Sequence, residues 1–196
     1  MRRSAAILVL GILVQGLTAT AQAATWKVDA AHTNVGFTVS HLFTSVQGRF
    51  DRFNGSIEFD PHQPEQTVVR GSIEASSINT NNEKRDKHLR SGDFFDVEKY
   101  PTLDFESTGI RDISGNKAKL EGKLTIHGVT RSVVLDVTFR GQGSDPWGNV
   151  RAGFAATLNI NRKDYGLNWN EMLETGGFLV GDEVEIRIDA EGLLED

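Results

Sequence analysis

Residues 150–160 read VRAGFAATLNI, and this stretch decides the fold. Every even position, from Val150 to Ile160, carries an apolar or small side chain, whereas the odd positions carry Arg, Gly, Ala, Thr and Asn. A two-residue period places alternate side chains on opposite faces of a strand. The stretch therefore predicts a long β-strand that buries one face.

Seven other segments show the same alternation and are expected to bury one face each. They are residues 35–41, 46–60, 69–75, 103–107, 118–126, 133–139 and 184–188. Turn residues such as Asp60-Pro61 and His127-Gly128 separate most of them, which is typical of antiparallel connections. Within 46–60 the apolar phase shifts by one residue, so we expect a bulge or bend near Asp51 and Arg52.

Strands of this kind must close on themselves or stack as two sheets, because an open sheet would expose its edges and one apolar face. The predicted inward positions include six small residues: Gly48, Gly71, Ala75, Gly122, Ala152 and Ala156. Small residues fill a barrel interior poorly, whereas eight-stranded barrels can hold one ligand. We predict an all-β, eight-stranded antiparallel barrel with a cavity; the alternative is that bulky neighbours fill the space.

Two segments interrupt the series of strands. Thr80 and Glu83 form a capping-box pattern and Gly92 follows a basic run, which predicts one short helix at about residues 82–91. Residues 162–181 are too long for a hairpin turn and are expected to form a lid or binding loop. Both segments, with the His127 turn, fall at one end of the barrel, which we predict to be the mouth.

The overall composition excludes several functional classes. The chain has 196 residues, enough for one domain of ordinary size, and a formal net charge of -6 without a long basic run, so a nucleic-acid partner is not expected. It contains no cysteine, which excludes disulfides, thiolate metal sites and a cysteine nucleophile.

The N-terminal segment has the pattern of a secretory signal peptide. Arg2 and Arg3 precede an apolar run at residues 5–17, and Ala21-Gln22-Ala23 fits the small-x-small cleavage rule. The apolar run is shorter than the roughly 20 residues that span a bilayer. We predict a cleaved signal peptide at 1–23, a barrel domain at 24–196 and a periplasmic protein without stable membrane insertion.

Candidate polar sites carry weaker signals. His41, His88 and His127 share the predicted mouth but lack the spacing that holds two metal ligands on one element, so no metal is predicted. The basic residues of the helix are interpreted as a solvated face. Paired carboxylates, Glu58 with Asp60 or Glu74 with Glu106, leave an exported hydrolase as the alternative function, although alternation points each of them outward.

Several blocks of sequence resemble the YceI-like polyisoprenoid-binding family and together span nearly all of residues 24–196. They are DAAH (29–32), FTVSHL (37–42), GRF (48–50), FNG (53–55), RDKHLRSGDFFD (85–96), YP (100–101), GKLTIHGVT (122–130), GQGSDPWG (141–148), RAGF (151–154) and DYG (164–166). The resemblance implies a lipocalin-like barrel that binds, transports or stores a long-chain isoprenoid or similar amphiphilic lipid without catalysis. It implies no cofactor besides the bound lipid, no catalytic residues, and a homodimer in some members.

The predicted ligand-binding residues combine inward strand positions with polar or aromatic residues at the predicted mouth. His41, Arg85 and Trp169 are placed at the mouth, beside the lipid headgroup. The remaining predicted contacts are Phe37, Val39, Phe50, Phe53, Ile73, Phe94, Leu103, Phe105, Leu124, Ile126, Leu135, Phe154, Ala156 and Leu158.

Overall fold

The computed structural model describes residues 23–174 and 176–195, so the signal peptide predicted at 1–23 lies outside the described residues except for Ala23. One α-helix, α1 (Glu83–Arg90), and four 3-10 helices accompany the strands. The strands are β1 (Ala24–Val28), β2 (Asn34–His41), β3 (Thr44–Phe50), β4 (Phe53–Phe59), β5 (Val68–Glu74), β6 (Ile78–Asn79), β7 (Thr102–Ser114), β8 (Lys117–Ile126), β9 (Val129–Ser144), β10 (Val150–Asn161) and β11 (Val180–Leu194).

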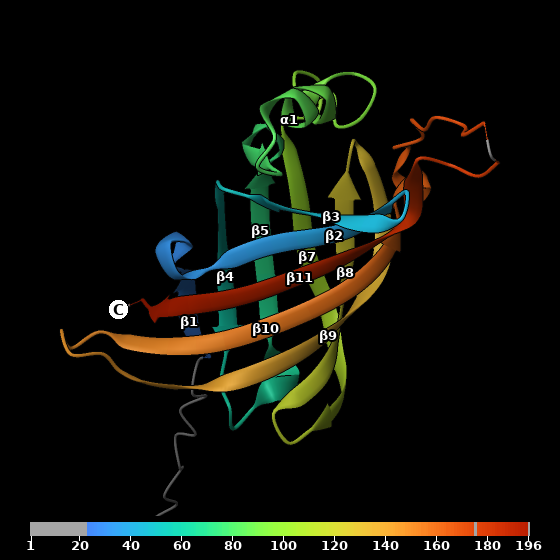
Figure 1. Ribbon diagram of the computed structural model, residues 1–196. Coiled ribbons are helices and arrows are strands. Elements are labelled where there is room, and N and C mark those ends of the chain that lie inside the picture. Colours follow the sequence, from blue (N-terminus) through green and yellow to red (C-terminus); the bar gives the residue numbers. More distant parts are fainter. Residues whose placement is uncertain (1–22, 175, 196) are drawn as a thin grey trace, which may run out of the picture.

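Eight strands close into an antiparallel barrel in the order β1-β4-β5-β7-β8-β9-β10-β11, and β11 pairs back to β1 (Figure 1). β2, β3 and β6 extend the same sheet beyond β11. The predicted fold class, an eight-stranded antiparallel barrel with one short α-helix, is confirmed. The stretch that decided the prediction forms β10, which pairs with β9 and β11 along most of its length.

Two pairs of consecutive strands, β1 with β2 and β3 with β4, are each separated by a short interruption. Residues 26–28 of β1 pair with 192–194 of β11, and residues 34–41 of β2 pair with 180–189 along the same strand. A 3-10 helix, Ala30–His32, separates β1 from β2. β3 and β4 are separated at Asp51 and Arg52, where the bend was predicted. β1 itself was not predicted from the sequence.

The connections define two ends of the barrel. The helix end, at the top of Figure 1, carries α1, the turns at 42–43 and 127–128, and the segment 166–179. The hairpin end carries the β4–β5 connection at 60–67, the β7–β8 turn at 115–116 and the β9–β10 turn at 145–149. His127 and Gly128 both have positive φ, 51° and 73°, as a two-residue hairpin turn between antiparallel strands requires.

The N-cap of α1 lies two residues after Thr80, the N-cap that the capping-box pattern predicted. Its N-cap is Asn82, whose side chain accepts a hydrogen bond from the Arg85 amide at 3.1 Å. Thr80 is buried and instead binds the Asp86 carboxylate through both its amide and its hydroxyl, at 2.9 and 2.5 Å. The helix ends at Arg90, and its C-cap is Ser91 rather than Gly92.

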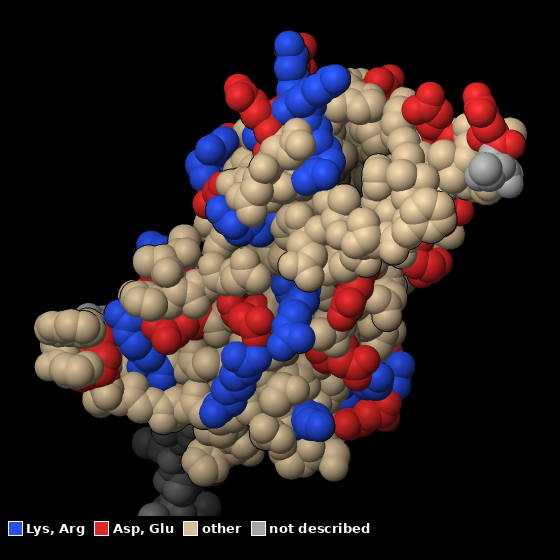
Figure 2. Space-filling model, in the orientation of Figure 1, with Lys and Arg blue, Asp and Glu red and all other residues tan. Residues whose placement is uncertain are grey.

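The outer surface carries charges of both signs. Figure 2 shows Lys and Arg side chains interspersed with Asp and Glu over the barrel and over α1. Arg187 and Arg140, for example, both pair with Asp189. No helix in the described part of the chain combines the length and apolar character that crossing a bilayer requires.

Candidate functional site: an apolar cavity inside the barrel

A cavity of about 340 Å³ lies inside the barrel, and every barrel strand contributes to its lining. This volume lies within the range of about 300–1,000 Å³ that is usual for small-molecule sites. The side chains at the inward-facing strand positions are almost all aliphatic or aromatic, because alternation along each strand places the polar residues on the outer face.

Charged residues in the described lining are confined to Arg70, Asp104 and Lys117, and each occupies an outward position of its strand. Arg70 donates a hydrogen bond to Glu58 at 3.1 Å, and Asp104 accepts one from Ser72 at 2.6 Å, both on the outer face. The interior therefore presents no charged side chain to a ligand.

Twelve of the predicted contact residues line this cavity. They are Phe37, Phe50, Phe53, Ile73, Leu103, Phe105, Leu124, Ile126, Leu135, Phe154, Ala156 and Leu158. Alternation along the strands thus identified much of the lining, and contact of these residues with a ligand stays a prediction.

The other five predicted contacts lie outside the lining. Val39 and His41 are half-buried near the end of β2, where His41 pairs with Thr44 and Val180. Trp169 packs against His88 and Phe94, with ring centroids 4.8 and 5.1 Å apart. These residues form part of the helix end rather than of the cavity wall.

Arg85, predicted beside the headgroup, supports the backbone of the helix end. Its guanidinium donates to the hydroxyl and to the carbonyl oxygen of Thr80, at 2.7 and 2.8 Å. Arg90 likewise donates to the carbonyl oxygens of Ser76 and Ile78, both at 2.7 Å. The conspicuous basic block therefore includes two arginines that anchor α1 to the 3-10 helix Ala75–Ser77, to β6 and to Thr80, which follows β6.

The sequence pattern missed part of the cavity lining because irregularities in β7 change which of its residues face inward. Its register shifts between Ser107 and Gly109 and again between Arg111 and Ser114. Bulges of this kind re-aim side chains, and Ile110 and Ile113 thereby reach the cavity. Pro61 and Pro64, which also line it, lie in the β4–β5 connection, where no alternation exists to reveal them. Four further lining residues occupy inward positions of predicted strands, so alternation could have identified them: Ile57, Phe59, Leu120 and Phe139.

The small inward residues leave less space than predicted. A Cβ on Gly122 would lie 2.4 Å from the Phe105 ring, and a Cβ on Gly48 would lie 2.3 Å from the Phe37 ring. These aromatic rings already occupy the room that the glycines provide. Gly71 and Ala156, in contrast, line the cavity.

The helix end is closed by packed side chains, and the prediction that it forms the mouth finds no support there. The lining includes no residue of α1, of the 127–128 turn or of the described part of 166–179. Ala75 and Ile78 are fully buried there, and Tyr165 and Leu167 pack into the same core cluster. Apolar residues outside the strands fold inward and plug this end. The lining reaches the surface instead at the hairpin end, through Pro61 and the half-exposed Ile113.

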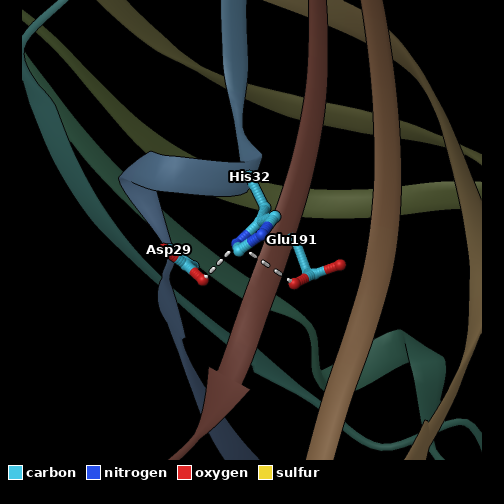
Figure 3. A group of neighbouring side chains, drawn as sticks. All are labelled: Asp29, His32 and Glu191. Carbon is cyan, nitrogen blue, oxygen red and sulfur yellow. Dashed lines mark hydrogen bonds and ion pairs between the residues drawn. The ribbon is translucent and has the colours of Figure 1, made fainter. Parts of the chain in front are cut away.

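A cluster of titratable side chains also lies at the hairpin end. The His32 Nδ1 lies 2.8 Å from an Asp29 oxygen and 3.8 Å from a Glu191 oxygen (Figure 3). Arg151 pairs with Asp29 at 2.8 Å, with Asp145 at 2.7 Å, and with Glu191. Hydrogen bonds from His32 and Arg151 lower the pKa of Asp29 to about 2.

This geometry makes the cluster an ion network that joins β1, β10 and β11. Asp29, His32 and Glu191 have a spacing that metal ligands could adopt. Arg151, however, already supplies positive charge to both carboxylates, which opposes the addition of a cation. Three of the family-like blocks, DAAH, GQGSDPWG and RAGF, thus meet in a structural contact.

Three of the four carboxylates of the hydrolase alternative are paired with arginines on the outer face: Glu58, Glu74 and Glu106. Glu74 binds Arg52, which lowers the pKa of Glu74 to about 2. Glu58 and Glu106 flank Arg70 at 3.1 and 3.7 Å. An acid catalyst of this class needs a raised pKa, so this arrangement offers no support for it.

The model of the YceI-like domain matches residues 26–192. A UPF0312 protein of Pseudomonas aeruginosa is 39% identical over 178 residues, covering 89% of this chain and 90% of the relative. A UPF0312 protein of Vibrio cholerae is 38% identical over 157 residues, covering 79% and 83%.

Solved structures show the same fold. Burkholderia cenocepacia BcnA superimposes with a TM-score of 0.75 at 27% identity, covering 84% of this chain and 98% of its own. The Campylobacter jejuni YCEI protein gives 0.69 at 32% identity, covering 86% and 96%. A polyisoprenoid binding domain from Saccharophagus degradans gives 0.67 at 16% identity, covering 88% and 99%. On the family match and these relatives, the chain belongs to the YceI-like domain family.

Proposed function

We propose that the protein binds the apolar chain of an isoprenoid or similar amphiphilic lipid inside the barrel, and that it transports or stores this lipid in the periplasm. The observation that carries the proposal is the cavity of about 340 Å³, lined by apolar side chains with no charged side chain on the inward phase. Such a cavity recognises hydrocarbon and little else.

The energetics suit a long chain. Burying one methylene group contributes about 0.8 kcal/mol, so one five-carbon isoprene unit contributes roughly 3–4 kcal/mol before ordering costs are subtracted. A few buried units therefore suffice for tight binding. The naming of the Saccharophagus degradans neighbour as a polyisoprenoid binding domain supports this choice of ligand class.

The proposal includes a role without catalysis. Three of the four carboxylates that could have served a hydrolase, Glu58, Glu74 and Glu106, are held in ion pairs with Arg52 and Arg70 on the outer face. Export to the periplasm is proposed on the sequence of residues 1–23, which has the charge, apolar run and cleavage motif of a signal peptide.

Lipid extraction tests the proposal. The protein is purified from its periplasm without detergent and extracted with organic solvent, and the extract is analysed by mass spectrometry. We expect a copurifying long-chain isoprenoid or related lipid. Absence of lipid, combined with no binding of added prenyl quinones or fatty amides, would contradict the proposal and favour the hydrolase alternative.

A pair of variants on β10 tests whether the lipid binds inside the cavity. Ala156 lines the cavity, whereas the exposed Thr157 points to the outer face of the same strand. Ala156→Phe fills cavity space, so we expect at least a tenfold loss of affinity with the far-ultraviolet circular dichroism of a folded β protein. Thr157→Phe serves as the matched control and should bind like the wild type. Equal affinities of the two variants would place the lipid elsewhere.

A further inference from the structure

The two ends of the cavity differ in how they are closed. At the helix end, Ala75, Ile78, Tyr165 and Leu167 form a buried layer above the lining residues Phe50, Leu103 and Ile126. This layer belongs to the main hydrophobic core, and breaking it would expose residues that are almost completely buried. Because opening here would cost the burial of several apolar side chains, the helix end acts as a fixed wall.

Arg162 fastens the segment that covers this wall. Its side chain is 5% exposed and donates hydrogen bonds to the carbonyl oxygens of Leu167, Trp169 and Gly181, at 2.5, 2.8 and 2.8 Å. These acceptors lie at both ends of the segment 166–181. One buried guanidinium thus ties the segment to the barrel, which opposes the lid role that its length suggested.

The hairpin end is open and apolar. Pro61, Pro64 and Ile113 bring the lining to the surface there, and the Ile113 side chain is 40% exposed. Charged residues near this rim carry both signs: Asp60 and Glu65 lie in the β4–β5 connection, and Asp112 and Lys117 lie on the strands that flank the 115–116 turn. The rim consequently offers a hydrocarbon entrance without a field that selects one sign of headgroup charge.

The interior cannot accept a charged headgroup. Transfer of an ionised group into an apolar site without a counter-charge or hydrogen bonds is strongly unfavourable. The charged residues of the described lining, Arg70, Asp104 and Lys117, all occupy outward strand positions. A phosphate or ammonium group therefore has to remain in water.

We infer that the lipid enters tail-first through the hairpin end, with its chain directed toward the plugged helix end and its headgroup left in water beside Pro61, Pro64 and Ile113. This inference rests on the proposed function and adds the direction of the ligand and the basis of its selection. Affinity then depends on the apolar chain and only weakly on headgroup charge.

Matched ligands test the selection. Geranylgeraniol, geranylgeranyl phosphate and geranylgeranylamine share one chain and carry a neutral, a negative and a positive headgroup. For the delipidated protein we expect dissociation constants within about threefold of one another, since exposed charges interact weakly. If none of the three binds, the proposed function fails. If one headgroup is preferred by more than about tenfold, the proposed function stands and the inference is overturned.

Photo-crosslinking tests the direction. A geranylgeranyl chain carries a diazirine either beside the headgroup or at the far end of the chain, and crosslinked peptides are identified by mass spectrometry. We expect the headgroup probe to label residues 60–67 and 110–117, and the chain-end probe to label peptides that contain Phe37, Leu124 or Ile126. The reverse pattern, or headgroup labelling of α1 and 166–174, overturns the inference.

A charge insertion gives a second readout that does not depend on loss of folding. Ile113 at the rim and Val134 on the side of β9 are both 40% exposed, and Val134 does not line the cavity. Ile113→Lys should strengthen binding of geranylgeranyl phosphate relative to the alcohol by about threefold to tenfold, because it places a cation near the headgroup. Val134→Lys should leave that ratio unchanged. An unchanged ratio in Ile113→Lys places the headgroup elsewhere and overturns the inference.

Discussion

Pairs of phenylalanine and glycine shape the cavity at the scale of single residues. Phe105 lies over Gly122 on the neighbouring strand β8, and Phe37 lies over Gly48 on β3. In both pairs the ring fills the space that a Cβ would need. The absence of a side chain therefore allows an aromatic ring to lie against the strand, and the cavity begins beyond the ring.

Gly122→Ala should destabilise the protein by about 1–3 kcal/mol, because the added methyl group forces the Phe105 ring out of its position. Gly109→Ala on β7 is the control, since its nearest neighbour would lie 3.9 Å from the new Cβ. Urea denaturation of both variants measures the difference. Similar stabilities for the two variants would show that Phe105 moves without cost, and that the ring does not define the wall.

At the scale of elements, α1 is held to the barrel by buried polar contacts rather than by its own helical propensity. Asp86 is buried and accepts the amide and hydroxyl hydrogens of Thr80, while Arg85 and Arg90 bind backbone carbonyl oxygens of the preceding segment. A helix of eight residues is marginal in isolation, so these tertiary contacts decide whether it forms.

Thr80→Val should therefore destabilise the protein more than Asn82→Ala. The first change removes a buried hydroxyl from Asp86 and from Arg85, which costs about 1–3 kcal/mol. The second removes an exposed N-cap, which costs about 1 kcal/mol. Thermal melting of the two variants gives the order. A larger loss in Asn82→Ala would assign the main stabilising role to the cap.

The same scale shows what sequence patterns can and cannot predict. Alternation identified the barrel strands other than β1, the bend at Asp51 and Arg52 and much of the lining, because the period of a strand fixes which face each side chain occupies. It did not reveal Ile110 and Ile113, since bulges in β7 change the phase. Nor could it show that Tyr165 and Leu167 fold inward, because residues outside strands have no period.

At the scale of the whole molecule, the two ends are stabilised by different forces. Apolar packing closes the helix end, whereas the ion network around Arg151 joins β1, β10 and β11 at the hairpin end. Folding lowers the pKa of Asp29 from 3.8 to about 2, and hydrogen bonds from His32 and Arg151 are the main causes. A carboxyl group with a lowered pKa contributes stability above its ordinary pKa and loses that contribution as the pH falls through the lowered value.

The free energy of unfolding should accordingly decrease as the pH falls from about 4 to about 2. Arg151→Met should lower the free energy of unfolding at pH 7 and show a smaller further loss in acid, because the pKa of Asp29 moves back toward its ordinary value. The control is Arg187→Met, which removes an arginine that is 64% exposed. Denaturation curves across this pH range that coincide for the two variants would contradict the role of the network.

Because the cavity is closed at one end and lined by apolar side chains, its affinity should depend on the length of the ligand's apolar chain. Titration of the delipidated protein with geraniol, farnesol and geranylgeraniol, which differ by one isoprene unit each, tests this claim most directly. We predict that each added unit tightens binding by about tenfold or more until the cavity is filled. Equal affinities for the three alcohols, or no binding by a protein that remains folded, would contradict a lipid-binding cavity in this barrel.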